Sequence, residues 1–186
     1  MVGKSMKKAC WILGVLAVCL LIGGRVALHY WRTPRTEDID LTCQGYLVYV
    51  DGSPSEVCTV QVRGEYRTWL NKDEWPRFGN TEEAAFRING KALDKHFSCM
   101  FPPDLDGYAA ATFRGENGQR TQYIIHEDFH LMMIELTRDG QRCLLVAPAG
   151  SREEAEALVA EALNFIRQRE FTWLEFYDFD FSQPLL

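Results

Sequence analysis

Residues 9–24 read ACWILGVLAVCLLIGG, sixteen residues without a charged side chain, and this stretch decides how the rest of the chain is organised. A helix of that length rises only about 24 Å, whereas the hydrocarbon layer of a bilayer is about 30 Å thick. The helix reaches a spanning length if it includes Arg25, whose guanidinium can extend to the headgroups, and then Tyr30 and Trp31, which are typical of the interface. The sequence therefore predicts a transmembrane signal-anchor helix over 9–31.

A cleaved signal peptide is the competing interpretation, because a basic start before a short apolar core is typical of one. Cleavage requires a small residue three positions before the cut, and Ile22 holds that position for a cut after Gly24. We therefore expect an uncleaved anchor. The lysines of the segment 1–8 favour a cytoplasmic N-terminus and an extracytoplasmic domain, although the basic residues on the two sides of the span are nearly balanced.

Residues 32–40 are expected to form a short linker, and residues 41–186 one domain long enough to bury a core. All 26 acidic residues lie after Thr36 together with 14 of the 20 basic ones, so this part carries a formal net charge of −12. Such an acidic surface argues against nucleic acid as a partner, because phosphates attract basic side chains.

The domain contains many short runs of β-branched and aromatic residues separated by turn residues. The clearest pair, 41–50 and 57–63, flanks Asp51-Gly52-Ser53-Pro54 and predicts a β-hairpin. Further strands are expected at 84–88, 95–101, 108–113, 122–125, 129–136 and 141–147. About eight short strands at this spacing indicate a mainly β (α+β) fold, an antiparallel sandwich or a small barrel.

One helix is predicted in the domain, over residues 151–168. Ser151 and Glu154 fit a capping box at its start, and apolar residues from Ala155 to Ile166 recur at helical spacing on one face. The run 143–147 is apolar throughout, as expected of a central strand that is covered on both sides. The helix is therefore expected to pack on the sheet.

Four cysteines lie in the domain, namely Cys43, Cys58, Cys99 and Cys143. In an oxidising compartment the first candidate disulfide joins Cys43 to Cys58, which flank one predicted hairpin. Buried free thiols are an equally good interpretation, because each cysteine lies in an apolar run that resembles a strand. The sequence contains no C-x-x-C pair, so a zinc knuckle is not indicated.

Residues 126–130 read His-Glu-Asp-Phe-His and match the pattern H-E-x-x-H. Over these five residues the chain resembles the zinc metallopeptidases called zincins, in which two histidines one helical turn apart bind zinc. The resemblance implies zinc as a cofactor with His126 and His130 as its ligands. It implies Glu127 as the general base that activates a zinc-bound water. A third ligand, as in the gluzincin branch, would be a glutamate of the following helix, Glu153 or Glu154, of which Glu154 is the candidate.

That chemistry requires a helix, whereas the flanking sequence favours strands. Ile124 and Ile125 precede the pattern and 131–134 follows it, and both runs are apolar and strand-like. Glu127-Asp128 between them is typical of a turn. We therefore expect a surface β-turn with no catalytic residue, no metal and no cofactor, in which the two histidine side chains diverge into solvent.

The C-terminal run 171–181 interleaves aromatic with acidic residues. It predicts a last edge strand or, alternatively, an exposed segment that pairs with the sheet of a partner. The candidate partner-binding residues are Phe171, Trp173, Tyr177 and Phe179. The sequence as a whole predicts a membrane-anchored, non-catalytic binding or assembly module with an unknown protein partner. The alternative is a membrane-anchored zinc metallopeptidase that uses residues 126–130.

Overall fold

The computed structural model describes residues 2–49, 55–80, 84–93, 97–114, 120–138 and 140–169. Within these ranges it contains an N-terminal helix α1 (Val2–Arg32), ten strands, a short 3-10 helix η1 (Pro103–Leu105) and a C-terminal helix α2 (Arg152–Gln168). The predicted mainly β fold with one packing helix after the sheet is confirmed. The predicted partner-binding run 171–181 lies outside the described residues.

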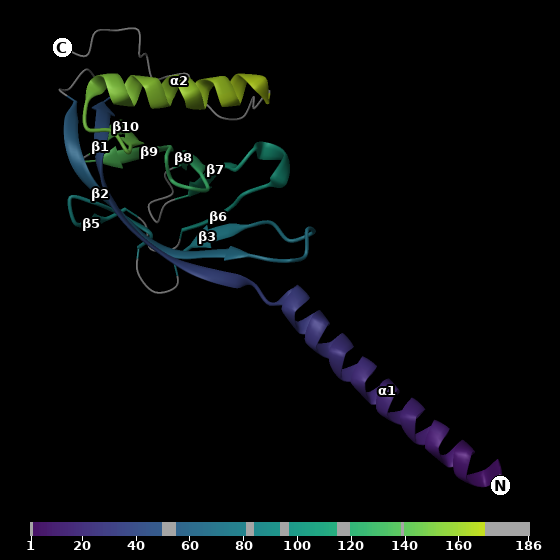
Figure 1. Ribbon diagram of the computed structural model, residues 1–186. Helices are drawn as coiled ribbons and strands as arrows, with labels where there is room; N and C mark the ends of the chain where they lie inside the picture. Colours follow the sequence, from purple (N-terminus) through teal and green to yellow (C-terminus); the bar gives the residue numbers. More distant parts are fainter. Residues whose placement is uncertain are drawn as a thin grey trace.

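The strands form one antiparallel sheet in the order β5-β4-β2-β1-β10-β9-β8-β7, while β3 also pairs with β2, and β6 pairs with β3. Their bounds are β1 (Arg35–Tyr49), β2 (Glu56–Thr68), β3 (Arg77–Gly79), β4 (Phe86–Ile88), β5 (Lys91–Ala92), β6 (Ser98–Met100), β7 (Tyr108–Arg114), β8 (Arg120–His126), β9 (Met132–Arg138) and β10 (Gln141–Ala147). The sheet is open but strongly curled, so that β3, β4 and β6 lie over the face formed by β8, β9 and β10 (Figure 1).

Aromatic pairs fill the concave side of this curled sheet. The ring of Phe78 in β3 lies 4.9 Å from that of Phe129, between centroids, and meets it edge-on. The ring of Phe97 lies 5.0 Å from that of Tyr123 in β8, between centroids, and is tilted against it. All four side chains are buried. These contacts attach β3 to the turn between β8 and β9, and the residue before β6 to β8 itself, and each pair joins segments far apart in the sequence.

Helix α2 covers the opposite face of the sheet. Its buried residues Ala155, Val159 and Ala162 belong to a second core together with Leu144 and Val146 of β10. The alternate residues of the same strand, among them Cys143 and Leu145, face the concave core. The prediction of a central strand covered on both sides is thus confirmed, and Figure 1 shows the resulting layers.

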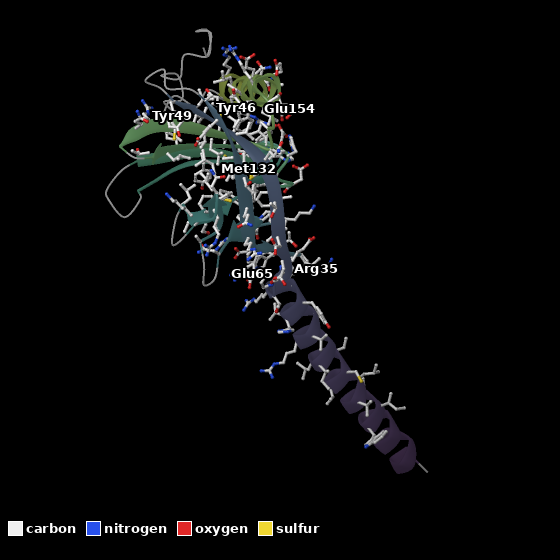
Figure 2. The ribbon with its side chains drawn as sticks, turned by 90° about the vertical axis from the view of Figure 1, so that its left-hand side faces the viewer. Arg35, Tyr46, Tyr49, Glu65, Met132 and Glu154 are labelled. Atoms are coloured by element: carbon white, nitrogen blue, oxygen red, sulfur yellow. The ribbon has the colours of Figure 1, made fainter. Side chains whose placement is uncertain are left out.

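Helix α1 stands away from the domain. Its segment Trp11–Arg32 is long and apolar enough to cross a membrane, judged by length and composition, and none of it is buried in the protein. Only Thr33 and Pro34 separate α1 from β1, which begins six residues before the strand expected from residue 41. Most of the predicted linker 32–40 is therefore strand. Figure 2 labels Arg35 at this junction and shows the side chains of α1 clear of the domain.

Candidate functional site at the β8–β9 turn

The H-E-x-x-H residues form a tight turn between β8 and β9. His126 ends β8, and its backbone N–H donates to the carbonyl of Leu131 at 2.9 Å. Phe129 has a left-handed φ of 60°, and its N–H donates to the carbonyl of His126 at 2.9 Å. The predicted β-turn is confirmed, so these residues lack the helix on which a zincin holds its histidines.

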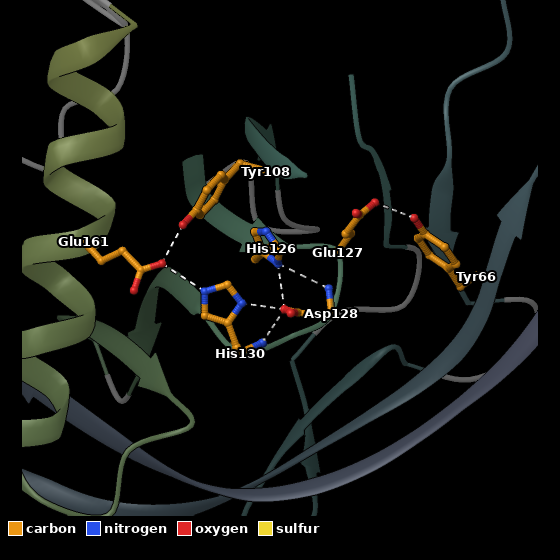
Figure 3. A network of polar contacts seen from close by, with 7 residues as sticks. All are labelled: Tyr66, Tyr108, His126, Glu127, Asp128, His130 and Glu161. Atoms are coloured by element: carbon orange, nitrogen blue, oxygen red, sulfur yellow. Dashed lines mark hydrogen bonds and ion pairs between the residues drawn. The ribbon is translucent and has the colours of Figure 1, made fainter. Parts of the chain in front are cut away.

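The expectation that the two histidine side chains diverge is wrong. The ring centroids of His126 and His130 are 4.2 Å apart. Both Nδ1 atoms contact Oδ1 of Asp128, at 2.6 Å from His126 and 2.5 Å from His130. The backbone N–H of His130 donates to the same oxygen at 3.0 Å. The left-handed residue Phe129 reverses the chain within the turn, which brings both imidazoles to one side of it (Figure 3).

The turn is also joined to α2. Nε2 of His130 lies 2.9 Å from Oε1 of Glu161, and the hydroxyl of Tyr108 in β7 donates to the same oxygen at 2.5 Å. The ring of Tyr108 stacks on Phe165 of α2 at 4.3 Å between centroids and meets the ring of His126 edge-on at 4.7 Å. Polar and aromatic contacts thus connect β7, the turn and the helix.

Hydrogen bonds stabilise the charged forms in this cluster although partial burial opposes them. Burial acts to raise the pKa of Asp128, but hydrogen bonds from the backbone and ring of His130 and from His126 hold that pKa well below its usual range. Burial acts to lower the pKa of His130, and hydrogen bonds to Glu161 and Asp128 more than reverse this, so the pKa is raised. Hydrogen bonds from Tyr108 and His130 lower the pKa of Glu161. Two ionised carboxylates therefore flank an imidazole that favours its protonated form.

The glutamates implied by the zincin resemblance have other partners. Oε2 of Glu127 accepts a hydrogen bond from the hydroxyl of Tyr66 at 2.8 Å, on the side of the turn away from Glu161 (Figure 3). Glu154 caps α2, because its Oε2 accepts from the N–H of Gly150 at 2.7 Å while its own N–H donates to Oγ of Ser151 at 3.3 Å. The capping interaction of Ser151 with Glu154 is thus present, and neither glutamate contacts the histidine pair through these bonds.

Sequence reasoning missed Asp128, Glu161 and Tyr108 as partners of the histidines. The spacing His-x-Asp-x-His was available as a signal, since a tight turn brings alternate residues together. Glu161 lies seven residues after Glu154, about 10.5 Å further along the same face of the helix. The correct carboxylate was therefore two turns from the expected one. No local signal assigns Tyr108, whose contact depends on the pairing of β7 with β8.

Three residues of the turn offer ligand atoms for a metal ion. One atom each from His126, Asp128 and His130 lies within 4.8 Å of the others. Their side chains are 17%, 62% and 43% exposed respectively, so an ion has access from solvent. Two imidazoles with one carboxylate form a donor set that suits a transition metal such as zinc.

The cysteines whose side chains the structure describes form no disulfide with one another, namely Cys19, Cys43, Cys58, Cys99 and Cys143. The predicted disulfide between Cys43 and Cys58 is therefore not formed in it. Cys43 faces Val60 and Cys58 faces Gly45 across β1 and β2, so the two cysteines are diagonal neighbours. Burial raises the pKa of Cys43 and raises that of Cys99 to about 12, so both remain protonated near neutral pH.

Comparisons of the chain with models of protein families, with curated proteins and with solved structures found no match. The structure by itself defines a curled antiparallel sheet with a packing helix and a separate apolar N-terminal helix.

Proposed function

We propose that the protein is a membrane-anchored, non-catalytic binding or assembly module whose domain is held directly at the bilayer surface. The observation that carries this proposal is the exposed apolar helix segment Trp11–Arg32, which is followed by only two residues before β1. Apolar side chains exposed around a whole helix are unfavourable in water, and lipid tails would cover them. The short connection would then keep the domain close to the lipid headgroups.

The helix acts, in this proposal, as an uncleaved signal-anchor with a cytoplasmic N-terminus and an extracytoplasmic domain. Three lysines precede the apolar stretch, at positions 4, 7 and 8. Basic residues beside a span are retained on the cytoplasmic side, which supports this orientation. The acidic surface of the domain is compatible with it, since anionic headgroups repel such a surface and leave it free for a protein partner.

The geometry of the β8–β9 turn supports binding over the alternative of a zinc peptidase. In the zincin mechanism the glutamate activates a water bound to the metal, so it must lie beside that water. Glu127 is bonded to Tyr66 instead, and His126 and His130 lie on a turn. The C-terminal run 171–181, predicted as an edge strand or alternatively as a segment that pairs with a partner, supplies the candidate partner-binding residues.

The membrane anchor and its orientation are tested by expressing the full chain in cells. We expect the intact 21.4 kDa chain to stay with the membranes after a carbonate wash. Protease added from the extracytoplasmic side should degrade the domain. A variant with Leu16→Lys and Leu20→Lys is the control. It should no longer stay with the membranes, because charged side chains in the span are costly. A shortened soluble domain would instead indicate a cleaved signal peptide. Protection of the domain from protease would indicate the opposite orientation, with the domain in the cytoplasm.

The binding role is tested by photo-crosslinking in the same cells, with a probe in place of Tyr177. A single crosslinked partner, absent from a chain that ends at residue 169, supports the module. Peptide hydrolysis that depends on zinc and is abolished by Glu127→Gln would contradict it and favour the alternative.

A further inference from the structure

We propose that His126, Asp128 and His130 form a binding site for one divalent transition-metal ion, with Glu161 of α2 as the outer carboxylate that orients His130. The bound ion fastens the β8–β9 turn to α2 and takes no part in hydrolysis. This inference goes beyond the membrane-anchored module and does not depend on it, because it rests on the geometry of the turn alone.

The ligand atoms converge on one point. Oδ1 of Asp128 lies 2.6 Å from Nδ1 of His126 and 2.5 Å from Nδ1 of His130. Ligand atoms around a tetrahedral zinc ion lie about 3.3 Å apart, given metal–nitrogen bonds of about 2.0–2.1 Å. Each of the two Nδ1–Oδ1 distances would therefore have to lengthen by about 0.8 Å to admit the ion. Asp128 is on an exposed turn and 62% exposed, so this movement meets little resistance.

The hydrogen-bond partners orient both imidazoles for metal binding. A histidine that binds a metal usually donates its other ring N–H to a carboxylate, which fixes the tautomer. Nε2 of His130 lies 2.9 Å from Glu161, and Glu161 is itself held by the hydroxyl of Tyr108 at 2.5 Å. Without an ion, Nδ1 of His130 donates to Asp128 at 2.5 Å. When an ion displaces that ring hydrogen, the hydrogen on Nε2 stays with Glu161 and the lone pair on Nδ1 binds the ion.

Nδ1 of His126 is directed at the same oxygen. It lies 2.6 Å from Oδ1 of Asp128 and donates to it while no ion is bound. Both rings thus direct Nδ1 at one carboxylate oxygen, and a bound metal ion would take the place of the two ring hydrogens there.

The donor set selects the kind of metal. Calcium and magnesium prefer oxygen ligands, whereas two imidazoles and one carboxylate suit zinc and its neighbours in the first transition row. Three protein ligands leave a position for water. Glu127 is bonded to Tyr66 instead, so it is not placed to act as the base that a zincin uses.

The site is tested by titrating Zn²⁺ into the tag-free full-length chain in detergent micelles, by calorimetry and by equilibrium dialysis with metal analysis. We expect one zinc ion per chain. His130→Gln and Asp128→Asn should weaken binding at least 10-fold, and Glu161→Gln should weaken it 10- to 100-fold, the range for an outer carboxylate. His29→Gln and Glu127→Gln are the matched controls and should bind as the unchanged protein does.

Co²⁺ in place of Zn²⁺ adds a spectroscopic readout, because its visible absorption reports nitrogen ligands and should disappear in His126→Gln. Far less than one equivalent of zinc, or affinity unchanged in both His130→Gln and Asp128→Asn, overturns the proposal and leaves a purely hydrogen-bonded cluster. Equal binding of Mg²⁺ also overturns it. Circular dichroism checks that each variant folds, and Asp128→Asn, on the exposed turn, carries the test if His130→Gln does not.

Discussion

At Gly45, β1 packs closely against two neighbouring strands. A Cβ atom at this position would lie 2.6 Å from Cγ2 of Val60 and 3.0 Å from Cδ1 of Leu145. Both neighbouring side chains are completely buried. Neither can move aside without displacing other residues of the concave core, because cores are packed as densely as organic crystals.

Gly45→Ala should therefore lower the free energy of unfolding by about 1–3 kcal/mol, as overpacking of a core does. Urea unfolding followed by near-UV circular dichroism measures this change. Thr42→Ala, at an exposed position of the same strand, is the control and should change stability by less than about 0.5 kcal/mol. Equal stability of the Gly45→Ala protein would contradict the close packing.

The β8–β9 turn shows how far residue-level prediction from the sequence extends. The pattern at 126–130 located the cluster, and the flanking Ile124 and Ile125 correctly favoured a turn over a helix. The direction of the two imidazoles depends on the left-handed backbone of Phe129. A phenylalanine rarely adopts that conformation, so the residue type does not predict it. The contact with Glu161 depended on how α2 packs across the sheet, which local sequence does not encode.

At the scale of elements, Tyr108 is the main polar link between the sheet and α2 at this end of the helix. Tyr108→Phe removes the hydroxyl that donates to Glu161 at 2.5 Å and keeps the ring that stacks on Phe165. The hydrogen bond is exposed in part, so we expect a loss of about 1 kcal/mol in the free energy of unfolding.

Hydrogen exchange separates this local effect from a general loss of stability. Amides in the second half of α2 should exchange faster in Tyr108→Phe. Tyr66→Phe, which removes the hydrogen bond to Glu127 on the other side of the turn, is the matched comparison and should leave α2 protected. Unchanged exchange in α2 of the Tyr108→Phe protein would show that the hydroxyl does not hold the helix.

Elements with a strong local signal were predicted well. The start of α2 followed from Ser151 and Glu154, and the central position of β10 followed from its unbroken apolar run. For the first six residues of β1 the sequence predicts a linker instead, because Pro34 and the charged residues after it do not resemble a strand. Its strand conformation comes from pairing with β2, an interaction between residues that are distant in the sequence.

At the scale of the whole molecule, the connection to α1 brings one loop of the domain close to the proposed membrane. Arg35 pairs with Thr68, so the loop from Thr68 to the start of β3 lies beside the end of the anchor (Figure 1). In that loop Leu70 and Trp75 are exposed apolar residues, and they are 47% and 41% exposed respectively. Tryptophan is enriched at the membrane interface, so the loop is expected to contact the headgroups.

In vesicles that contain brominated lipids, which quench tryptophan fluorescence, Trp75→Phe should therefore reduce the quenched part of the emission. The comparison is a second protein that carries Ala157→Trp as well, because this exposed position of α2 lies on the far side of the sheet from α1 (Figure 1). Its added emission should remain unquenched. If Trp75→Phe reduces only the unquenched emission, the loop faces away from the bilayer.

The uninterrupted pairing of β1 has a mechanical consequence. The strand leaves the anchor after two residues, pairs with β2 over its first thirteen residues and lies between β2 and β10 in the sheet. The ladder bonds of antiparallel strands run perpendicular to the strands, so a pull on the anchor along β1 loads many bonds at once in shear. We therefore expect the sheet to transmit tension between the membrane and a bound partner without unzipping from one end. The domain would then act as a stiff mechanical connection and would not extend under load.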